Sequence, residues 1–230
     1  MTDRITRREF VRTGAFAAAA PLLARAPAIA APRAAWPVVV ASANGNRFKN
    51  GGTRTCVHEA YERIARGEDV LDAAIAGVNL VELDPEDTSV GYGGLPNADG
   101  VVQLDACCMD GPTMRAGAVA ALEGFRHPAR VALELLRRTS RVLLVGGGAA
   151  RFARSVGFEE EELLTDRARK IWLYWKANMS DRDDWVAFPG QADDPDVAWY
   201  IAKYGAIRPT GTINLCAVDG AGKVGGTTST

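Results

Sequence analysis

Short apolar runs rich in β-branched residues recur along this 230-residue chain, and segments with helical spacing lie between them. The clearest runs are 37–42, 141–145 and 213–218, which predict buried strands. Helical spacing is clearest over 56–66 and from Asp69 to Asp84, where Pro85 ends the pattern. Strands that alternate with helices predict an α/β or α+β fold.

The remaining segments extend this order. They predict a tight turn at Asp99-Gly100 followed by a strand over 101–104, a strand over 114–122, a helix over 128–139, a turn over 146–148, a helix over 159–178 and a strand from 223 to 230. The stretch 180–206 mixes Asp, Pro, Gly and aromatic residues without a period, so we predict a long surface linker there.

Composition excludes several classes of protein. Lys and Arg number 27 and Asp and Glu 28, a balance that argues against a general nucleic-acid binder. No apolar run reaches about 18 residues without a charge or proline, so no stable membrane span is expected. No CxxC spacing or histidine cluster suggests a metal, and no cofactor is implied.

The first thirty residues are predicted to be an export signal rather than part of the fold. Arg7-Arg8 precedes Phe10, an Ala-rich stretch follows, and Ala28-Ile29-Ala30 has the small-x-small form of a cleavage site. Paired arginines are typical of a twin-arginine signal, which predicts a periplasmic or secreted protein that begins near Ala31. The alternative is an amphipathic helix with chance arginines.

Export would carry four cysteines into an oxidising compartment. Adjacent cysteines rarely pair with each other, and nothing else indicates a disulfide framework. We therefore predict buried free thiols, with the disulfide status left open, for Cys56, Cys107, Cys108 and Cys216.

One glycine-rich segment could be mistaken for a dinucleotide loop. A G-x-G-x-x-G/A spacing would use Gly146, Gly148 and Arg151, but the last position should be small. No acidic strand end follows about twenty residues later, so a structural turn is the better interpretation. His58 and His127 have no nucleophile elbow near them, and we expect ordinary surface or capping roles.

The segment 209–219, with Gly226-Thr227-Thr228-Ser229-Thr230 after it, resembles the processing site of glycosylasparaginases. These enzymes belong to the asparaginase type 2 family of N-terminal nucleophile hydrolases. The stretch from Ser89 to Asn97, the triplet Leu104-Asp105-Ala106 and the blocks Met109-Asp110-Gly111 and His127-Pro128 resemble the family in the same order. The resemblance covers about 37–230.

The resemblance implies an α+β fold, the four-layer α-β-β-α sandwich of this family. It implies a precursor that cuts itself between Gly211 and Thr212, so that 31–211 forms the alpha-chain part and 212–230 begins the beta-chain part. Thr212 would supply the nucleophilic hydroxyl and, once N-terminal, an α-amine with a reference pKa of about 7.7–8.0 as the base. Thr230 matches the family position that supports the nucleophile.

The implied reaction is hydrolysis of the side-chain amide of glycosylated asparagine to aspartate, by a homodimer of processed chains. An isoaspartyl peptidase or L-asparaginase using the same nucleophile is an alternative, and so is a catalytically inactive fragment. A nucleotide-binding module is a distant further alternative.

Three departures from the family pattern are visible. Thr210-Gly211 stands where better-known members have His-Asp, so the base for self-cleavage is unnamed. Ala43 stands where a tryptophan helps to form the substrate site. The substrate-binding residues are expected beyond Thr230, so we expect the chain to be incomplete and inactive as it stands.

Overall fold

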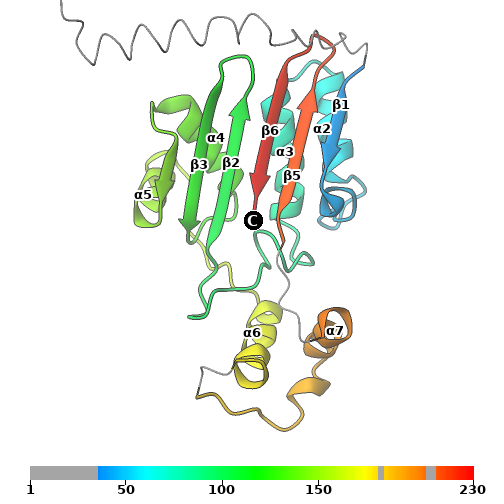
Figure 1. The fold of residues 1–230 in the computed structure, drawn as a ribbon, viewed down its shortest axis with the longest axis vertical. Helices are drawn as coiled ribbons and strands as arrows, with labels where there is room; N and C mark the ends of the chain where they lie inside the picture. Colours follow the sequence, from blue (N-terminus) through cyan, green and yellow to red (C-terminus); the bar gives the residue numbers. More distant parts are fainter. Residues whose placement is uncertain (1–35, 181–183, 206–210) are drawn as a thin grey trace, which may run out of the picture. The chain divides into compact units, whose positions relative to one another are not determined.

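A computed structural model describes residues 36–180, 184–205 and 211–230, which lie within one compact unit, Arg33–Thr230. The predicted export signal lies outside the described residues. A six-stranded mixed sheet runs through the unit in the order β1-β5-β6-β2-β3-β4 (Figure 1). Its strands are β1 (Val38–Ala41), β2 (Leu104–Asp110), β3 (Arg115–Leu122), β4 (Leu143–Val145), β5 (Ile213–Val218) and β6 (Val224–Ser229). Every pair is antiparallel except β3 with β4.

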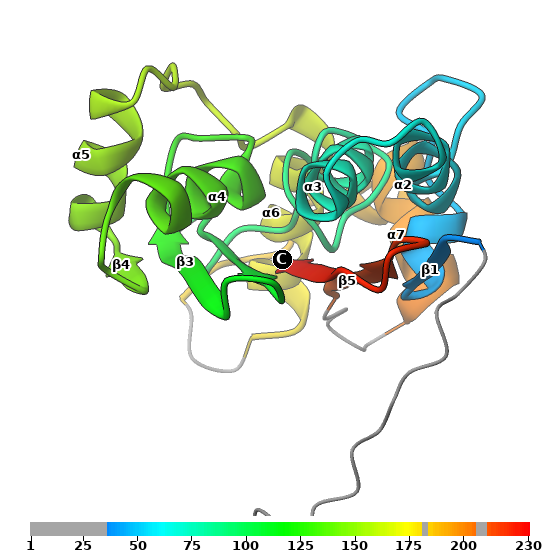
Figure 2. The ribbon, with the colours of Figure 1, turned by 90° about the horizontal axis from the view of Figure 1, so that it is seen from above.

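Four helices lie on one face of this sheet (Figure 2). They are α2 (Cys56–Ala65), α3 (Val70–Glu82), α4 (Pro128–Arg138) and α5 (Gly147–Ser155). Asp69, where the predicted helical pattern begins, caps α3, because its carboxylate accepts the backbone N–H groups of Leu71 and Asp72. Pro128 occupies the first turn of α4, where its missing N–H is not needed.

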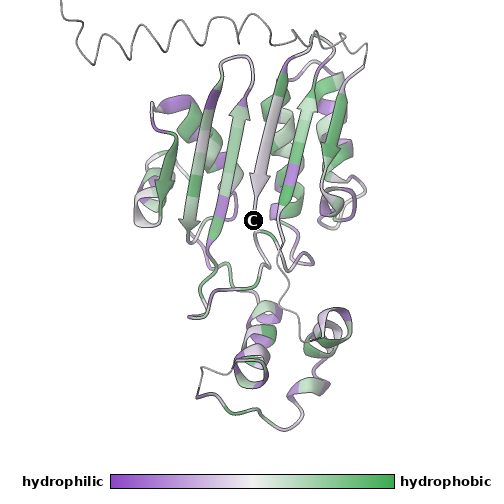
Figure 3. Cartoon of the chain, in the orientation of Figure 1, coloured by the Kyte–Doolittle hydropathy of each residue, from purple (hydrophilic) through white to green (hydrophobic). Residues whose placement is uncertain are grey.

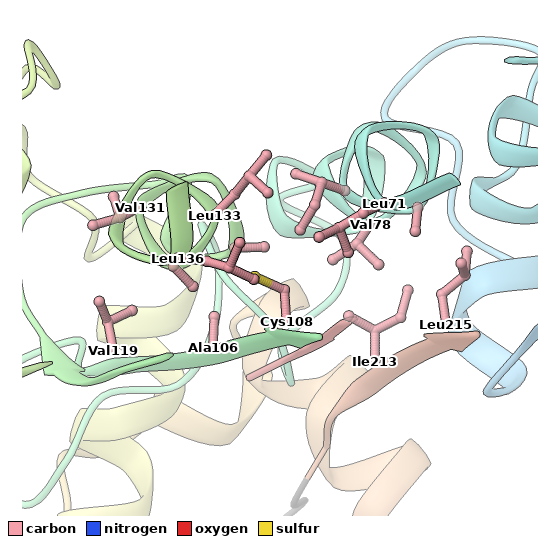
Figure 4. Close-up of a cluster of buried hydrophobic side chains, with 14 of the residues drawn as sticks. Leu71, Val78, Ala106, Cys108, Val119, Val131, Leu133, Leu136, Ile213 and Leu215 are labelled. Atoms are coloured by element: carbon pink, nitrogen blue, oxygen red, sulfur yellow. The ribbon is translucent and has the colours of Figure 1, made fainter. Parts of the chain in front are cut away.

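The core lies between these helices and the sheet. Leu71 and Val78 of α3 face Ile213 and Leu215 of β5, and all four side chains are at most 3% exposed (Figure 4). The same layer continues through α4 and β3. A Cβ atom at Gly117 would lie 2.3 Å from the Ala132 carbonyl oxygen, so the small residues of β3 let α4 approach closely.

The opposite face of the sheet, which none of the helices α2 to α5 covers and which we call the open face, carries exposed apolar side chains. Val38, Val40, Met109, Leu143 and Val145 are 48–63% exposed. Alternation explains the contrast, because successive residues of a strand point to opposite faces. Along β5 the residues that point to the helices are buried and those between them are exposed. Most strands are coloured hydrophobic over much of their length, whereas the Gly- and Thr-rich β6 is pale (Figure 3).

The prediction of a linker over 180–206 was wrong. The segment contains a short 3-10 helix, η2 (Gln191–Asp193), and the helix α7 (Pro195–Tyr204). Asp194 caps α7, and Tyr200 is fully buried. α7 packs against α6 (Asp166–Asn178), and the Lys170 ammonium lies 2.9 Å from the Asp194 carboxylate.

Other predicted boundaries were also wrong. The strand predicted over 101–104 begins only at Leu104 and continues to Asp110. The residues before it form a local turn, in which the Asn97 side chain accepts the Asp99 N–H. The hairpin turn lies instead between β2 and β3. The helix predicted over 159–178 begins only at Asp166. Of the turn predicted over 146–148, only Gly146 precedes α5, which begins at Gly147. A short 3-10 helix, η1 (Ala43–Asn46), follows β1.

All four cysteines are free thiols, but only two are buried. Cys56 and Cys108 lie in the core, whereas Cys107 and Cys216 are exposed on the open face of the sheet, which corrects the prediction of four buried thiols. In the described part of the chain, no helix is long and apolar enough to cross a membrane. No group of metal-binding side chains is found among those residues.

Candidate active site

The β5–β6 hairpin brings Thr212 and Thr230 to the same end of the sheet. Ile213 pairs with Ser229, and the same register continued by one residue places Thr212 opposite Thr230. Both paired residues point to the helices, so the two threonines belong to the open face. The turn that fixes this register is closed by Asp219, whose carboxylate accepts the N–H groups of Ala221 and Lys223.

Thr230 is held from two directions. The N–H of Asp105 donates to the Thr230 hydroxyl oxygen at 3.1 Å, and the Thr230 N–H donates to the Asp105 carbonyl oxygen at 2.9 Å. The N–H of Gly91 approaches the Thr230 carbonyl oxygen at 3.4 Å. The end of β6 therefore lies beside the loop that follows α3, as Figure 1 also shows.

The Gly211–Thr212 peptide bond lies against that loop. The Thr212 hydroxyl lies 2.8 Å from the Gly211 carbonyl oxygen. A Cβ atom at Gly211 would lie only 2.1 Å from the Cβ and Oγ atoms of Ser89. Only glycine fits this position without a shift of Ser89, which gives a steric reason for Gly211.

Four polar residues to which the sequence analysis assigned no role lie at the Gly211–Thr212 bond, two of them in contact with Thr212. The Ser42 hydroxyl and the Asn44 amide approach the Thr212 carbonyl oxygen at 3.4 and 3.5 Å. The Ser89 hydroxyl donates to Asp87 at 2.6 Å, and the Asn44 amide approaches the same carboxylate at 3.4 Å. Ser42 ends a predicted strand and Asn44 opens an Asn/Gly-rich loop, but neither pattern indicates contact with a residue so distant in the chain.

Gly91 allows the backbone of the loop after α3 to pass close to the end of that helix. Gly91 has a φ of +62°, and a Cβ atom there would lie 2.2 Å from the Glu82 carbonyl oxygen. That oxygen accepts the Tyr92 N–H at 2.7 Å. The close approach requires glycine and fixes the loop between the end of α3 and the two threonines.

Glu82 lies directly behind the site and is fully buried. Its carboxylate accepts the Ser229 hydroxyl at 2.6 Å, the Ala129 N–H at 3.0 Å and the Asn79 amide. Burial raises the pKa of Glu82 to about 7, and these hydrogen bonds only partly oppose the shift. The residue before Thr230 is thus tied to a carboxyl group that titrates near neutral pH.

A shallow groove on the open face begins at Asn214 and Thr228, the next residues on this face after Thr212 and Thr230. The Asn214 amide donates to the Thr228 hydroxyl at 2.7 Å, one step along the strands from Thr212 and Thr230. The groove then runs past Cys107, Met109, Cys216 and Gly226. Ala43 lies in η1, between the two residues that approach the Thr212 carbonyl.

The glycine-rich segment and the two histidines considered in the sequence analysis are not part of the group of residues around Thr212. Gly146 donates its N–H to the Ala120 carbonyl oxygen and forms the turn between β4 and α5, whose first residues are Gly147 and Gly148. His58 is exposed on α2. His127 occupies the N-cap position of α4 without a side-chain cap bond, and burial lowers the pKa of its imidazole.

Comparison with known proteins places these observations in a family. A family model described as Asparaginase matches residues 27–230. The chain is 47% identical over 117 residues to an N(4)-(beta-N-acetylglucosaminyl)-L-asparaginase of Elizabethkingia miricola, an alignment that covers 51% of this chain and 34% of that protein. A putative enzyme of the same name from Drosophila melanogaster is 40% identical over 114 residues, covering 50% of this chain and 29% of that protein.

A plant-type L-asparaginase of Pyrococcus abyssi is 38% identical over 128 residues, covering 56% of this chain and 41% of that protein. The aligned part of the chain thus spans between 29% and 41% of the length of these relatives. The family model nevertheless matches nearly all of the sequence, including the hairpin that carries both threonines. The chain belongs to the asparaginase family of N-terminal nucleophile hydrolases.

Proposed function

We propose that the protein is an amidohydrolase precursor that cuts itself before Thr212 and then hydrolyses the side-chain amide of asparagine-type substrates. The observation that carries the proposal is the Gly211–Thr212 peptide bond. Its Thr212 hydroxyl lies 2.8 Å from the Gly211 carbonyl oxygen, and its glycine fits against Ser89 where no other residue would.

In the proposed self-cleavage, the Thr212 hydroxyl oxygen attacks the Gly211 carbonyl carbon and its proton passes to the departing Thr212 nitrogen. The amide becomes an ester, and water then hydrolyses the ester to leave a carboxylate on Gly211. Thr212 is left with a free hydroxyl and a free α-amine. An α-amine with a reference pKa of about 7.7–8.0 can accept the hydroxyl proton at neutral pH.

The same hydroxyl would next attack the side-chain amide of the substrate. An acyl-enzyme ester forms, the nitrogen of the side-chain amide leaves with its substituent, and water hydrolyses the ester to release aspartate. The position of Thr230 across the hairpin supports its role as the residue that holds the nucleophile, because the register places it directly opposite Thr212.

Glycosylated asparagine is the substrate we favour, since the relative at 47% identity carries that activity in its name. The plant-type L-asparaginases at 38–39% identity support asparagine as the alternative, beside the isoaspartyl peptide that the family resemblance implies. Turnover of the two substrate classes by the processed protein would decide between them. An inactive fragment remains the third possibility for the 230 residues alone, and an assay of this chain beside the product of the complete reading frame tests it.

We also propose the four-layer α-β-β-α arrangement for the whole protein. The exposed apolar side chains on the face opposite the helices support it, because a second sheet would bury them.

Self-cleavage is tested by expression of the complete reading frame with Thr212→Ala, Thr212→Cys and, as a control, Thr113→Ala in the β2–β3 turn. We expect the alanine variant at 212 to stay uncut, and the cysteine variant to be cut because a thiol can replace the hydroxyl. Intact mass and N-terminal sequencing give the result. A fragment starting at residue 212 from Thr212→Ala would refute cleavage by this side chain.

Export through the twin-arginine pathway is a separate proposal that rests on the order of features in residues 1–30. Replacement of Arg7 and Arg8 by lysine should leave the protein in the cytoplasm, as cell fractionation would show. Unchanged export of the double variant would exclude this pathway.

A further inference from the structure

Asp87 is a buried carboxylate whose charge is not paired with a basic side chain in the described part of the chain. It is 3% exposed. Its partners are the N–H of Ser89 at 3.0 Å, the Ser89 hydroxyl at 2.6 Å and the Asn44 amide at 3.4 Å. Among the described residues only neutral donors satisfy this carboxylate, and a buried carboxylate without an opposite charge beside it is costly, so its position calls for a reason.

The partners of Asp87 lie on both sides of the Gly211–Thr212 bond. Ser89 touches Gly211, since a Cβ atom there would overlap its hydroxyl. Asn44 approaches the Thr212 carbonyl oxygen at 3.5 Å. With one C–C bond of about 1.5 Å added to the contact distances of 2.1 and 2.6 Å, the carboxylate lies no more than about 6 Å from the Gly211 Cα atom.

We propose that Asp87 is the positioning residue for self-cleavage: it holds Ser89 against Gly211 and Asn44 beside Thr212, and so fixes the bond that Thr212 attacks. The inference rests on the proposed function. Asp87 touches neither reacting atom and acts through the two side chains that it orients. Its geometry matters because a small misplacement of a reacting group can cost roughly 100-fold in rate.

Asp84 provides a matched control in the same loop. It is equally buried, at 5% exposure, and its carboxylate accepts the N–H groups of Lys49, Asn50 and Glu86. It is therefore a structural carboxylate that contacts neither Ser89 nor Asn44 through a hydrogen bond. Replacement of either aspartate by asparagine removes a buried charge, but only one replacement alters the contacts that flank Gly211 and Thr212.

The experiment compares Asp87→Asn with Asp84→Asn in the complete reading frame. The rate constant for appearance of the fragment that starts at Thr212 is measured on gels. Thermal midpoints are measured in a Thr212→Ala background, so that every variant is a single uncut chain. We expect Asp87→Asn to slow cleavage by roughly 10- to 100-fold and Asp84→Asn by less than about threefold, at similar losses of thermal midpoint.

A second comparison separates positioning from a general effect on folding. In a Ser89→Ala background the hydroxyl that Asp87 holds is gone and only its contact with Asn44 remains, so Asp87→Asn should slow cleavage further by clearly less than it does in the unaltered protein. Equal slowing by the two asparagine variants, or a full additional effect of Asp87→Asn without the Ser89 hydroxyl, would overturn the proposal.

The outcome for Thr212→Ala keeps this inference distinct from the proposed function. If the unaltered protein is not cut, or Thr212→Ala is cut, the proposed function fails and the role of Asp87 fails with it. If only the unaltered protein is cut, the function stands and the comparison of Asp87 with Asp84 decides the inference.

Discussion

Replacement of Glu82 by glutamine should make the stability of the protein less sensitive to pH. Glu82 is fully buried behind Ser229, and its pKa is about 7 in the folded state against an ordinary 4.5. Between these values the folded protein keeps a proton that the unfolded chain has released. The folded state therefore loses stability as the pH rises from 4.5 to 7, and the loss is complete above the folded pKa.

The magnitude follows from the same two pKa values. One pH unit between them corresponds to about 1.4 kcal/mol, so Glu82 lowers the free energy of unfolding by about 2 to 3 kcal/mol between pH 5 and pH 8. Whole domains are stable by only about 5–15 kcal/mol, so the effect is large enough to measure. Glutamine keeps a carbonyl oxygen for the Ala129 N–H and the Ser229 hydroxyl but cannot ionise.

The assay is urea unfolding, followed by circular dichroism at several pH values between 5 and 8 and at constant ionic strength. The free energy of unfolding of Glu82→Gln minus that of the unaltered chain should increase with pH by about 2 to 3 kcal/mol. A constant offset from imperfect hydrogen bonding does not affect this slope. Glu159→Gln, at an exposed position, is the control. A difference that stays constant across the range would show that burial does not control the charge of Glu82.

Two further predictions follow from close contacts and from burial. Gly211→Ala should slow self-cleavage and lower the thermal midpoint, because the added Cβ atom would lie 2.1 Å from Ser89. At the control position, Gly148→Ala, the added Cβ atom has no neighbour within 4 Å and should change cleavage little. Gels measure the cleavage of both variants, and thermal melts measure their stability. A thiol reagent should label two cysteines of the 230-residue chain rapidly and two only on unfolding, as counted by mass spectrometry. The rapid pair is Cys107 and Cys216, and the slow pair is Cys56 and Cys108, whose thiol pKa values burial raises to about 12.

Local patterns predicted the elements whose signals agree with their packing. The run 213–218 is apolar and β-branched, and it forms β5; Asp69 caps α3 where the apolar spacing begins. Local patterns gave a wrong prediction where a turn motif forms a different kind of turn from the one its composition indicates. Asp99-Gly100 is a hairpin pair by composition, but the Asn97 side chain accepts the Asp99 and Val101 N–H groups and closes a local loop instead.

The helix α7 was missed because its cap, Asp194-Pro195, lies among other turn-forming residues that hide the start of the helical spacing. Its burial of Tyr200 depends on α6, a tertiary contact that no local window contains.

The same distinction applies to the candidate site. The sequence predicted the strands 213–218 and 223–230, and the family resemblance identified Thr212 and Thr230. The register of the two strands places these threonines opposite each other. Local patterns could not identify Ser42, Asn44 and Ser89, because they reach Thr212 or Gly211 from segments more than a hundred residues away. Asn44 and Thr212, for example, are 168 positions apart. Asp87 reaches the site through Asn44 and Ser89. Chain topology rather than residue pattern brings them together.

The position of the β5–β6 hairpin within the sheet has a consequence for any molecule cut after Gly211. The hairpin pairs with β1 on one side and with β2 on the other. A cut would therefore leave the two inner strands on one polypeptide and the strands around them on another. The pieces could separate only if both ladders and the core beneath them were lost, so dissociation and denaturation would be one event. Refolding would then require two chains to meet, and its rate would depend on concentration, whereas the uncut precursor folds as a single chain.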